Sequence, residues 1–140
     1  MKRIIIIGCV AAIAAALVAA PAGAAVKHFE GKVEGGGKIA FDVKFNKHGK
    51  PKSAGYFSFS SIPVRCSDGA HGGVNFSYND VIPVTDRKFS YHFSSFKASF
   101  QGKINRRGKK ASGKVSYGPN ELSGHPSCTT AGQRDWTASR

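Results

Sequence analysis

Beyond residue 25, the 140-residue sequence has little of what helices are built from: one leucine, Leu122, no methionine and three glutamates. The scarcity of these strong helix formers excludes a helical bundle. Acidic residues are also few, with 8 Asp and Glu against 21 Lys and Arg in the whole chain. This part has no long hydrophobic run, so we expect no membrane anchor in it. Apolar residues nevertheless recur throughout it, which excludes a long disordered tail.

The first 25 residues differ from the rest and predict an export signal. A short positive start precedes an apolar, alanine-rich run over residues 4–20. Ala22 and Ala24 give the A-x-A spacing of a cleavage site, so we expect a signal-peptide helix cleaved after Ala24 or Ala25. The alternative is an uncleaved anchor, for which a run of about 17 residues is short. The expected product is a secreted, extracellular, single domain over residues 26–140.

Two cysteines remain in the exported part, Cys66 and Cys128. Because thiols outside the cytoplasm oxidise, we expect one structural disulfide between them. In the chain-entropy model, closing so long a loop stabilises the fold by about 4 kcal/mol. A catalytic or metal-binding pair would favour C-x-x-C spacing or clustered histidines, and the sequence has neither. The five histidines show no ligand spacing, so we expect no metal and no cofactor.

Alternation of apolar and polar residues dominates the rest of the chain and predicts strands. The clearest cases are 39–45 and 96–104, where phenylalanine or aliphatic residues fall on every second position except for the glycine at 102. A turn at Asn79-Asp80 is expected to separate a strand over 74–78 from a short segment over 81–84, which carries Pro83 and so suits a sheet edge or a strand end. Eight or nine strands at spacings of about 8 to 15 residues predict an all-β fold, either an antiparallel β-sandwich or a closed barrel. The sequence does not choose between the two.

One short pattern, a glycine followed by lysine within a strand, recurs at 29–33, at 100–104 and, more weakly, at 111–115. In the structural interpretation, each glycine marks a bulge or a place where a neighbouring strand or aromatic ring comes close. In the functional interpretation, the three lysines form a basic stripe on one face: Lys32, Lys103 and Lys114. We favour the structural interpretation, because glycine in strands usually reflects backbone crowding.

The loop after Cys66 has the composition of a catalytic loop, since Ser67, Asp68 and His71 lie close together in it. A small extracellular hydrolase using Asp68 and His71 is therefore one hypothesis. However, catalytic partners must converge in space around an oxyanion hole, and adjacency in sequence does not ensure this. The sequence contains no G-x-S-x-G elbow and no marked pair of carboxylates. We therefore assign no catalytic residue and expect a non-enzymatic domain.

The strongest functional signal is positive charge gathered at two predicted turns. The residues expected to bind an anionic polymer are Lys47, Lys50, Lys52, Arg106, Arg107, Lys109 and Lys110. If the two turns share one end of the domain, they make a positive surface that attracts anions in a salt-dependent way. The alternative is that they are solvated hairpin tips that protect sheet edges and solubility. The expected partner is an anionic polysaccharide or cell-wall polymer, bound by a monomer, with no specific nucleic acid.

Two further binding modes stay open. Tyr56, Tyr78, Tyr91 and Tyr117 on a flat sheet could stack on sugars, as in a carbohydrate-binding module. A barrel could instead carry a small ligand, which an apolar interior cavity would indicate.

Several short motifs occur together: F-x-G from Phe29, I-x-F-x-V from Ile39, F-x-G-K-I from Phe100, and C-T-T-x-G from Cys128 before a Trp-Thr-Ala ending. In this combination the chain resembles a group of small secreted, disulfide-bonded, β-sandwich-like proteins of actinobacterial-type bacteria. The likeness covers most of the chain after the export signal. The resemblance implies the all-β fold and the disulfide. It implies no catalytic residue, because the group has no assigned activity.

Overall fold

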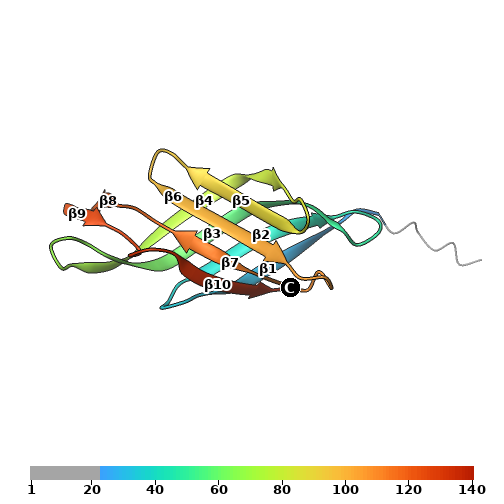
Figure 1. The fold of residues 1–140 in the computed structure, drawn as a ribbon, viewed down its shortest axis with the longest axis horizontal. Helices are drawn as coiled ribbons and strands as arrows, with labels where there is room; N and C mark the ends of the chain where they lie inside the picture. Colours follow the sequence, from blue (N-terminus) through green and yellow to red (C-terminus); the bar gives the residue numbers. More distant parts are fainter. Residues whose placement is uncertain (1–22) are drawn as a thin grey trace, which may run out of the picture.

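Residues 23–140 are described by the computed structural model, and within them every regular element is a strand (Figure 1). Residues 1–22, which hold most of the expected signal peptide, lie outside the described part. In the described part, no helix has the length and apolarity needed to cross a bilayer.

Ten strands follow one another along this part of the chain. They are β1 (Ala25–Val33), β2 (Lys38–Phe45), β3 (Pro51–Arg65), β4 (His71–Pro83), β5 (Lys88–Phe93), β6 (Ala98–Ile104), β7 (Lys110–Ser116), β8 (Asn120–Leu122), β9 (His125–Cys128) and β10 (Arg134–Ser139). Eight of them form one antiparallel sheet in the order β4-β3-β2-β1-β10-β7-β6-β5, and β8 pairs with β9 separately. The all-β prediction is therefore confirmed.

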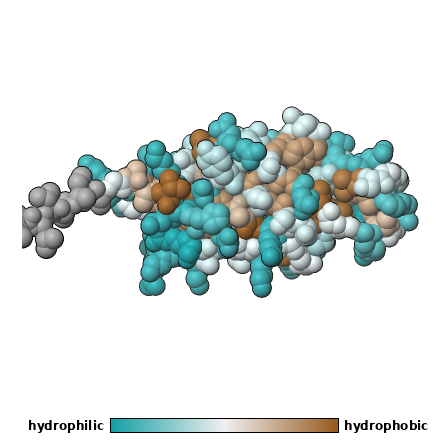
Figure 2. Space-filling view, turned by 180° about the vertical axis from the view of Figure 1, so that it is seen from behind, coloured by the Kyte–Doolittle hydropathy of each residue, from teal (hydrophilic) through white to brown (hydrophobic). Residues whose placement is uncertain are grey.

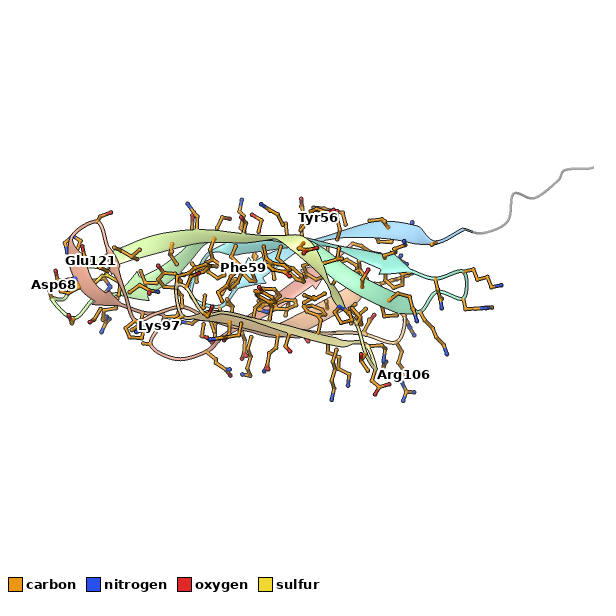
Figure 3. The ribbon with its side chains drawn as sticks, turned by 90° about the horizontal axis from the view of Figure 1, so that it is seen from above. Tyr56, Phe59, Asp68, Lys97, Arg106 and Glu121 are labelled. Carbon is orange, nitrogen blue, oxygen red and sulfur yellow. A yellow bond between two sulfur atoms is a disulfide. The ribbon has the colours of Figure 1, made fainter. Side chains whose placement is uncertain are left out.

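The large sheet coils until its edge strands, β4 and β5, face each other, which gives a flattened and nearly closed barrel (Figure 3). Within the described chain these two strands share no hydrogen-bonded ladder. Aromatic side chains fill the seam instead, with ring centroids 4.0 Å apart for Tyr78 and Tyr91 and 5.9 Å apart for Phe76 and Phe93. The arrangement thus lies between the two predicted architectures.

Phenylalanine rings fill the interior. Phe29, Phe41 and Phe57 are fully buried on neighbouring strands, and their rings stack in sequence at centroid distances of 5.2 and 5.0 Å. From the facing half of the sheet, Phe100 approaches Phe57 to 4.4 Å. Such offset and tilted pairs add to the stabilisation that area burial provides. Because rings occupy the interior positions, the described residues give no support to the ligand-carrying barrel.

Two glycines make room for the largest buried side chain, Trp136. Gly102 and Gly113 are cross-strand partners, and they lie in register between Phe89 and Trp136. A Cβ added at Gly102 would lie 2.5 Å from Cζ of Phe89 and 2.6 Å from Cζ2 of Trp136. The two rings therefore occupy the space that side chains on β6 and β7 would fill. This confirms the structural interpretation of the recurring glycines at these two positions.

The predicted turn at Asn79-Asp80 is wrong, because β4 runs unbroken through both residues. The β3–β4 ladder changes register here, between the pairs Gly55–Val81 and Phe57–Tyr78. The two residues thus belong to a bulge, which uses turn-forming residues to kink a strand without reversing it. The expectation that 81–84 lies at a sheet edge or a strand end is confirmed, since β4 is an edge of the sheet and ends at Pro83.

The predicted disulfide between Cys66 and Cys128 is present. Next to it, Arg65 and Thr129 exchange backbone hydrogen bonds with N···O distances of 2.9 and 3.0 Å. The bridge thereby fixes the chain after β9 against the end of β3.

Candidate functional site

The two basic turns named from the sequence lie at the same end of the barrel. Gly108, in the β6–β7 turn, packs on Phe45, the last residue of β2, and an added Cβ would lie 2.9 Å from the phenylalanine ring. Arg140 joins them, because its amide donates to the Lys109 carbonyl at 3.2 Å and its guanidinium lies 5.8 Å from the Phe45 ring centroid. The geometric condition for a concentrated positive surface is therefore met.

Both turns are built in the same way, as Asn-x-x-Gly followed by lysine. The Asn46 side-chain oxygen accepts the amides of His48 and Lys50 at 3.0 and 2.9 Å. The Asn105 side-chain oxygen accepts two amides in the β6–β7 turn, at 3.0 and 3.2 Å. The glycine of each turn has positive φ, 72° at Gly49 and 63° at Gly108. Asparagine and glycine thus fix the backbone, which leaves the basic side chains free to point into solvent.

The β4–β5 connection adds one cation, Arg87, that the sequence interpretation did not assign to this surface. The amide of Ile104 donates to the carbonyl of Arg87 at 2.8 Å, and the amide of Val84, at the start of the connection, donates to the carbonyl of Lys52 at 2.9 Å. These bonds hold the connection, and Arg87 with it, at the same end as the two basic turns.

Charge is divided unevenly between the two ends of the barrel. We define the basic end as residues 44–52, 84–88, 105–110 and 140, which hold eleven Lys or Arg and one acid, Asp86. We define the far end as residues 34–37, 65–71, 94–97 and 117–134, which hold three Lys or Arg and three Asp or Glu. Figure 3 shows Arg106 at one end and Asp68, Lys97 and Glu121 towards the other. Seen from behind in Figure 2, the most hydrophilic side chains gather in the left half of the view, on the side of the basic end.

Acids do not compensate this charge. Among the Lys and Arg of residues 23–140, Lys114 is the one that forms a salt bridge, with Asp135 at 2.7 Å. Uncompensated cations on one end raise the local concentration of anions there and speed their association.

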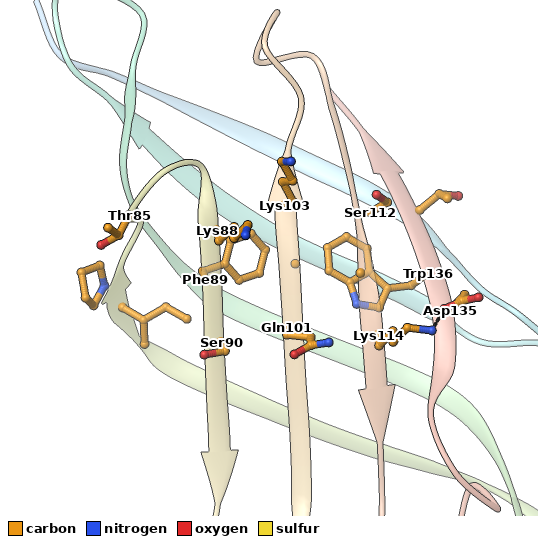
Figure 4. A pocket seen from close by; sticks show the side chains of 15 residues that line it. Thr85, Lys88, Phe89, Ser90, Gln101, Lys103, Ser112, Lys114, Asp135 and Trp136 are labelled. Carbon is orange, nitrogen blue, oxygen red and sulfur yellow. Dashed lines mark hydrogen bonds and ion pairs between the residues drawn. The ribbon is translucent and has the colours of Figure 1, made fainter.

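Two shallow hollows lie side by side on the outer face of the sheet, next to the basic end, and Figure 4 shows the first of them. The first extends from Lys88 on β5 across β6 and β7 to Asp135 on β10. The second extends from Lys32 on β1 across β10 and β7 to β6 and Arg106. They meet at three residues that line both hollows: Lys103, Ser112 and Thr137.

The structure does not assemble the proposed hydrolase pair. Asp68 bonds to His125 instead, at 2.7 Å from Nδ1, and this hydrogen bond lowers the pKa of the Asp68 carboxyl below its usual value. His71 lines a separate hollow, and the Ser67 hydroxyl donates to the Pro126 carbonyl at 3.2 Å. Among the described residues no serine hydroxyl bonds to a histidine ring, the contact that would activate a serine nucleophile.

The other candidate sites are also not assembled. Tyr117 is buried, Tyr56 is 59% exposed, and Tyr78 packs against Tyr91 across the seam, so the four tyrosines do not form one flat row. In residues 23–140 no group of three or more His, Cys, Asp or Glu side chains is placed to hold a metal ion.

These features define a class: a small, disulfide-bonded, all-β domain with its positive charge concentrated at one end. Comparisons with protein-family models, with curated proteins and with solved structures found no match for the chain.

Proposed function

We propose that this protein is a secreted, non-enzymatic module that binds an anionic extracellular or cell-wall polymer through its basic end. The observation that carries the proposal is the eleven-to-one excess of basic over acidic residues there, against an even balance at the far end. The disulfide and the resemblance to small secreted bacterial β proteins fit an extracellular location.

A polymer fits this surface better than a small anion does. An exposed ion pair contributes about 0–1 kcal/mol, so one contact would not hold a ligand. A chain with many charges can contact several turns at once and release counterions at each contact, which makes affinity high at low salt and low at high salt. The seven residues named from the sequence, with Arg87 and Arg140, form the proposed contact surface.

The test compares two variants that each lose two positive charges. The basic-end variant is Arg106→Gln/Arg107→Gln, and the far-end variant is Arg65→Gln/Lys97→Gln. On immobilised heparin, a sulfated glycan, we expect the oxidised protein to be retained and to elute as salt rises. The basic-end variant should elute at lower salt, with the slope of log K against log salt reduced by about 1.5 for two lost contacts. The far-end variant should elute close to the unaltered protein.

Equal shifts in both variants would mean that net charge alone causes retention, and the proposal would then be wrong. No retention of the unaltered protein on heparin or on a phosphate-bearing wall polymer at low salt would also contradict it.

A further inference from the structure

One line of residues crosses six strands on the outer face of the sheet and carries a lysine pair at each end. At one end, Lys38 on β2 is directly opposite Lys32 on β1, and at the other, Lys103 on β6 is directly opposite Lys88 on β5. The register then continues between the pairs through Thr137 on β10 and Ser112 on β7. We call these exposed side chains the lysine–hydroxyl row: Lys38, Lys32, Thr137, Ser112, Lys103 and Lys88.

The two lysine pairs break a rule of sheet stability. Like charges directly opposite each other, with Cβ atoms about 5 Å apart, destabilise an antiparallel pair. Within residues 23–140, none of these four lysines has an acid within 4.0 Å. A sequence that keeps such a conflict twice in one row is typical of a site selected for binding rather than for stability.

Other cross-strand positions on the same outer face are matched in charge. Lys114 is opposite Asp135, with 2.7 Å between Nζ and Oδ1. His28 is opposite Asp42, with 2.7 Å between Nδ1 and Oδ1. The sheet therefore pairs opposite charges at two other places, whereas both directly opposed lysine pairs of the described strands lie in the lysine–hydroxyl row.

The row also coincides with the hollowed part of the surface. Thr137, Ser112 and Lys103 line both hollows, Lys32 lines one of them and Lys88 lines the other, while Lys38 lines neither. At about 4.8 Å between neighbouring strands, four strand steps place the centres of the two lysine pairs about 19 Å apart along the curved outer surface. This path bends around the barrel, because β2 and β5 face each other across the core, where the ring centroids of Phe41 and Phe89 are 5.6 Å apart. Between the two lysine pairs lie two hydroxyl groups and no acid.

We propose that the row binds one stretch of a linear anionic glycan, a sugar or polyol chain that carries sulfate, carboxylate or phosphate groups. Anionic groups lie at the two lysine pairs, and a neutral hydroxyl-bearing unit lies on Thr137 and Ser112. This inference rests on the proposed function and adds to it a polymer class and a path away from the basic end. Polyphosphate and duplex DNA offer comparable charge without free hydroxyls between the anionic groups.

The experiment uses two further variants. The lysine variant, Lys88→Gln/Lys103→Gln, removes one like-charge pair, and the hydroxyl variant, Ser112→Ala/Thr137→Val, removes both hydroxyls while keeping side-chain shape. Affinities for a heparin oligosaccharide and for inorganic polyphosphate of equal charge are measured at one fixed salt concentration. The lysine variant should bind both ligands about 10- to 50-fold more weakly. The hydroxyl variant should bind the glycan about 3- to 10-fold more weakly and polyphosphate unchanged.

A stability measurement separates loss of binding from loss of fold. Because it relieves repulsion, the lysine variant should unfold at the same or a higher urea concentration than the unaltered protein. Weaker binding by a protein that also unfolds at lower urea concentration would count against the row.

The outcomes distinguish the row from the proposed function. If the basic-end variant loses affinity and neither row variant does, the row is refuted while the proposed function stands. If none of the three loses affinity, both are refuted. If the hydroxyl variant loses as much affinity for polyphosphate as for the glycan, the glycan assignment is refuted. Tighter binding of duplex DNA than of the glycan by the unaltered protein would refute it too.

Discussion

Replacing Gly102 by alanine tests the packing that shapes the middle of the barrel. The added Cβ would lie 2.5 Å from Cζ of Phe89 and 2.6 and 2.7 Å from two ring atoms of Trp136. Phe89 and Trp136 are 4% and 1% exposed, so neither ring can move into solvent without opening the core. Overpacking of a filled core costs about 1–3 kcal/mol, and two rigid rings place this site in the upper half of that range. The entropy that alanine removes from the unfolded chain offsets about 0.4–1 kcal/mol.

The matched control is Gly72→Ala on β4, where an added Cβ has no atom within 4 Å and φ is not positive. We expect urea denaturation to give Gly102→Ala a free energy of unfolding about 1–2 kcal/mol lower than that of the unaltered protein. Gly72→Ala should be unchanged or slightly more stable, for the entropic reason alone. Equal stability of the two variants would show that Trp136 and Phe89 do not depend on the glycine, and would refute this packing account.

Two further outcomes concern the disulfide and one histidine. Replacing Cys66 and Cys128 by alanine opens a loop with a sequence separation of 62. The free energy of unfolding, measured by denaturation, should be about 4 kcal/mol lower for this variant than for the oxidised protein. A difference below about 1 kcal/mol would contradict the entropic estimate. The hydrogen bond to Asp42 raises the pKa of His28 above 6.5, so its stabilising contribution is complete below pH 6.5 and is lost as pH rises through the raised folded pKa. His28→Gln should therefore reduce stability, by less than about 1 kcal/mol at this half-exposed site, at pH 5 and not at pH 9; a loss independent of pH would exclude the ion pair.

Strand alternation could be predicted from the sequence because it depends on one local property, the burial of a single face. Ile39, Phe41, Val43 and Phe45 were placed on one face, and all four are at most 5% exposed. By contrast, the hairpin of β8 and β9 could not be predicted from residues 118–128. This segment carries Gly, Pro and Ser and shows no apolar alternation, so no sequence pattern predicts the two strands.

Whether the two basic turns lie at the same end of the barrel depends on how many strands separate them along the chain. In an antiparallel meander, successive turns alternate between the two ends of the sheet. With the predicted turn at Asn79-Asp80, the two basic turns would lie at opposite ends. The bulge inside β4 removes that reversal and brings both turns to one end. Side-chain chemistry does not separate a bulge from a turn, because the same residue types favour both.

The lysine–hydroxyl row could not be predicted from the sequence, for a different reason. Lys32, Lys103 and Lys114 were named together as one stripe, on the basis of a repeated motif. Register places Lys32 and Lys103 in one row, and it places Lys114 in the next row, opposite Asp135. Pairing between β1 and β10 joins strands from opposite ends of the sequence. Local periodicity carries no information on such long-range register.

Backbone amide chemical shifts, followed while a heparin oligosaccharide is added at low salt, test the central claim most directly. The account predicts that the largest changes fall in residues 46–50, 85–88 and 105–110 and at Arg140, and that they disappear as salt is raised. Changes centred on residues 65–71 or on the aromatic seam between β4 and β5, or changes that persist at high salt, would contradict binding through the basic end.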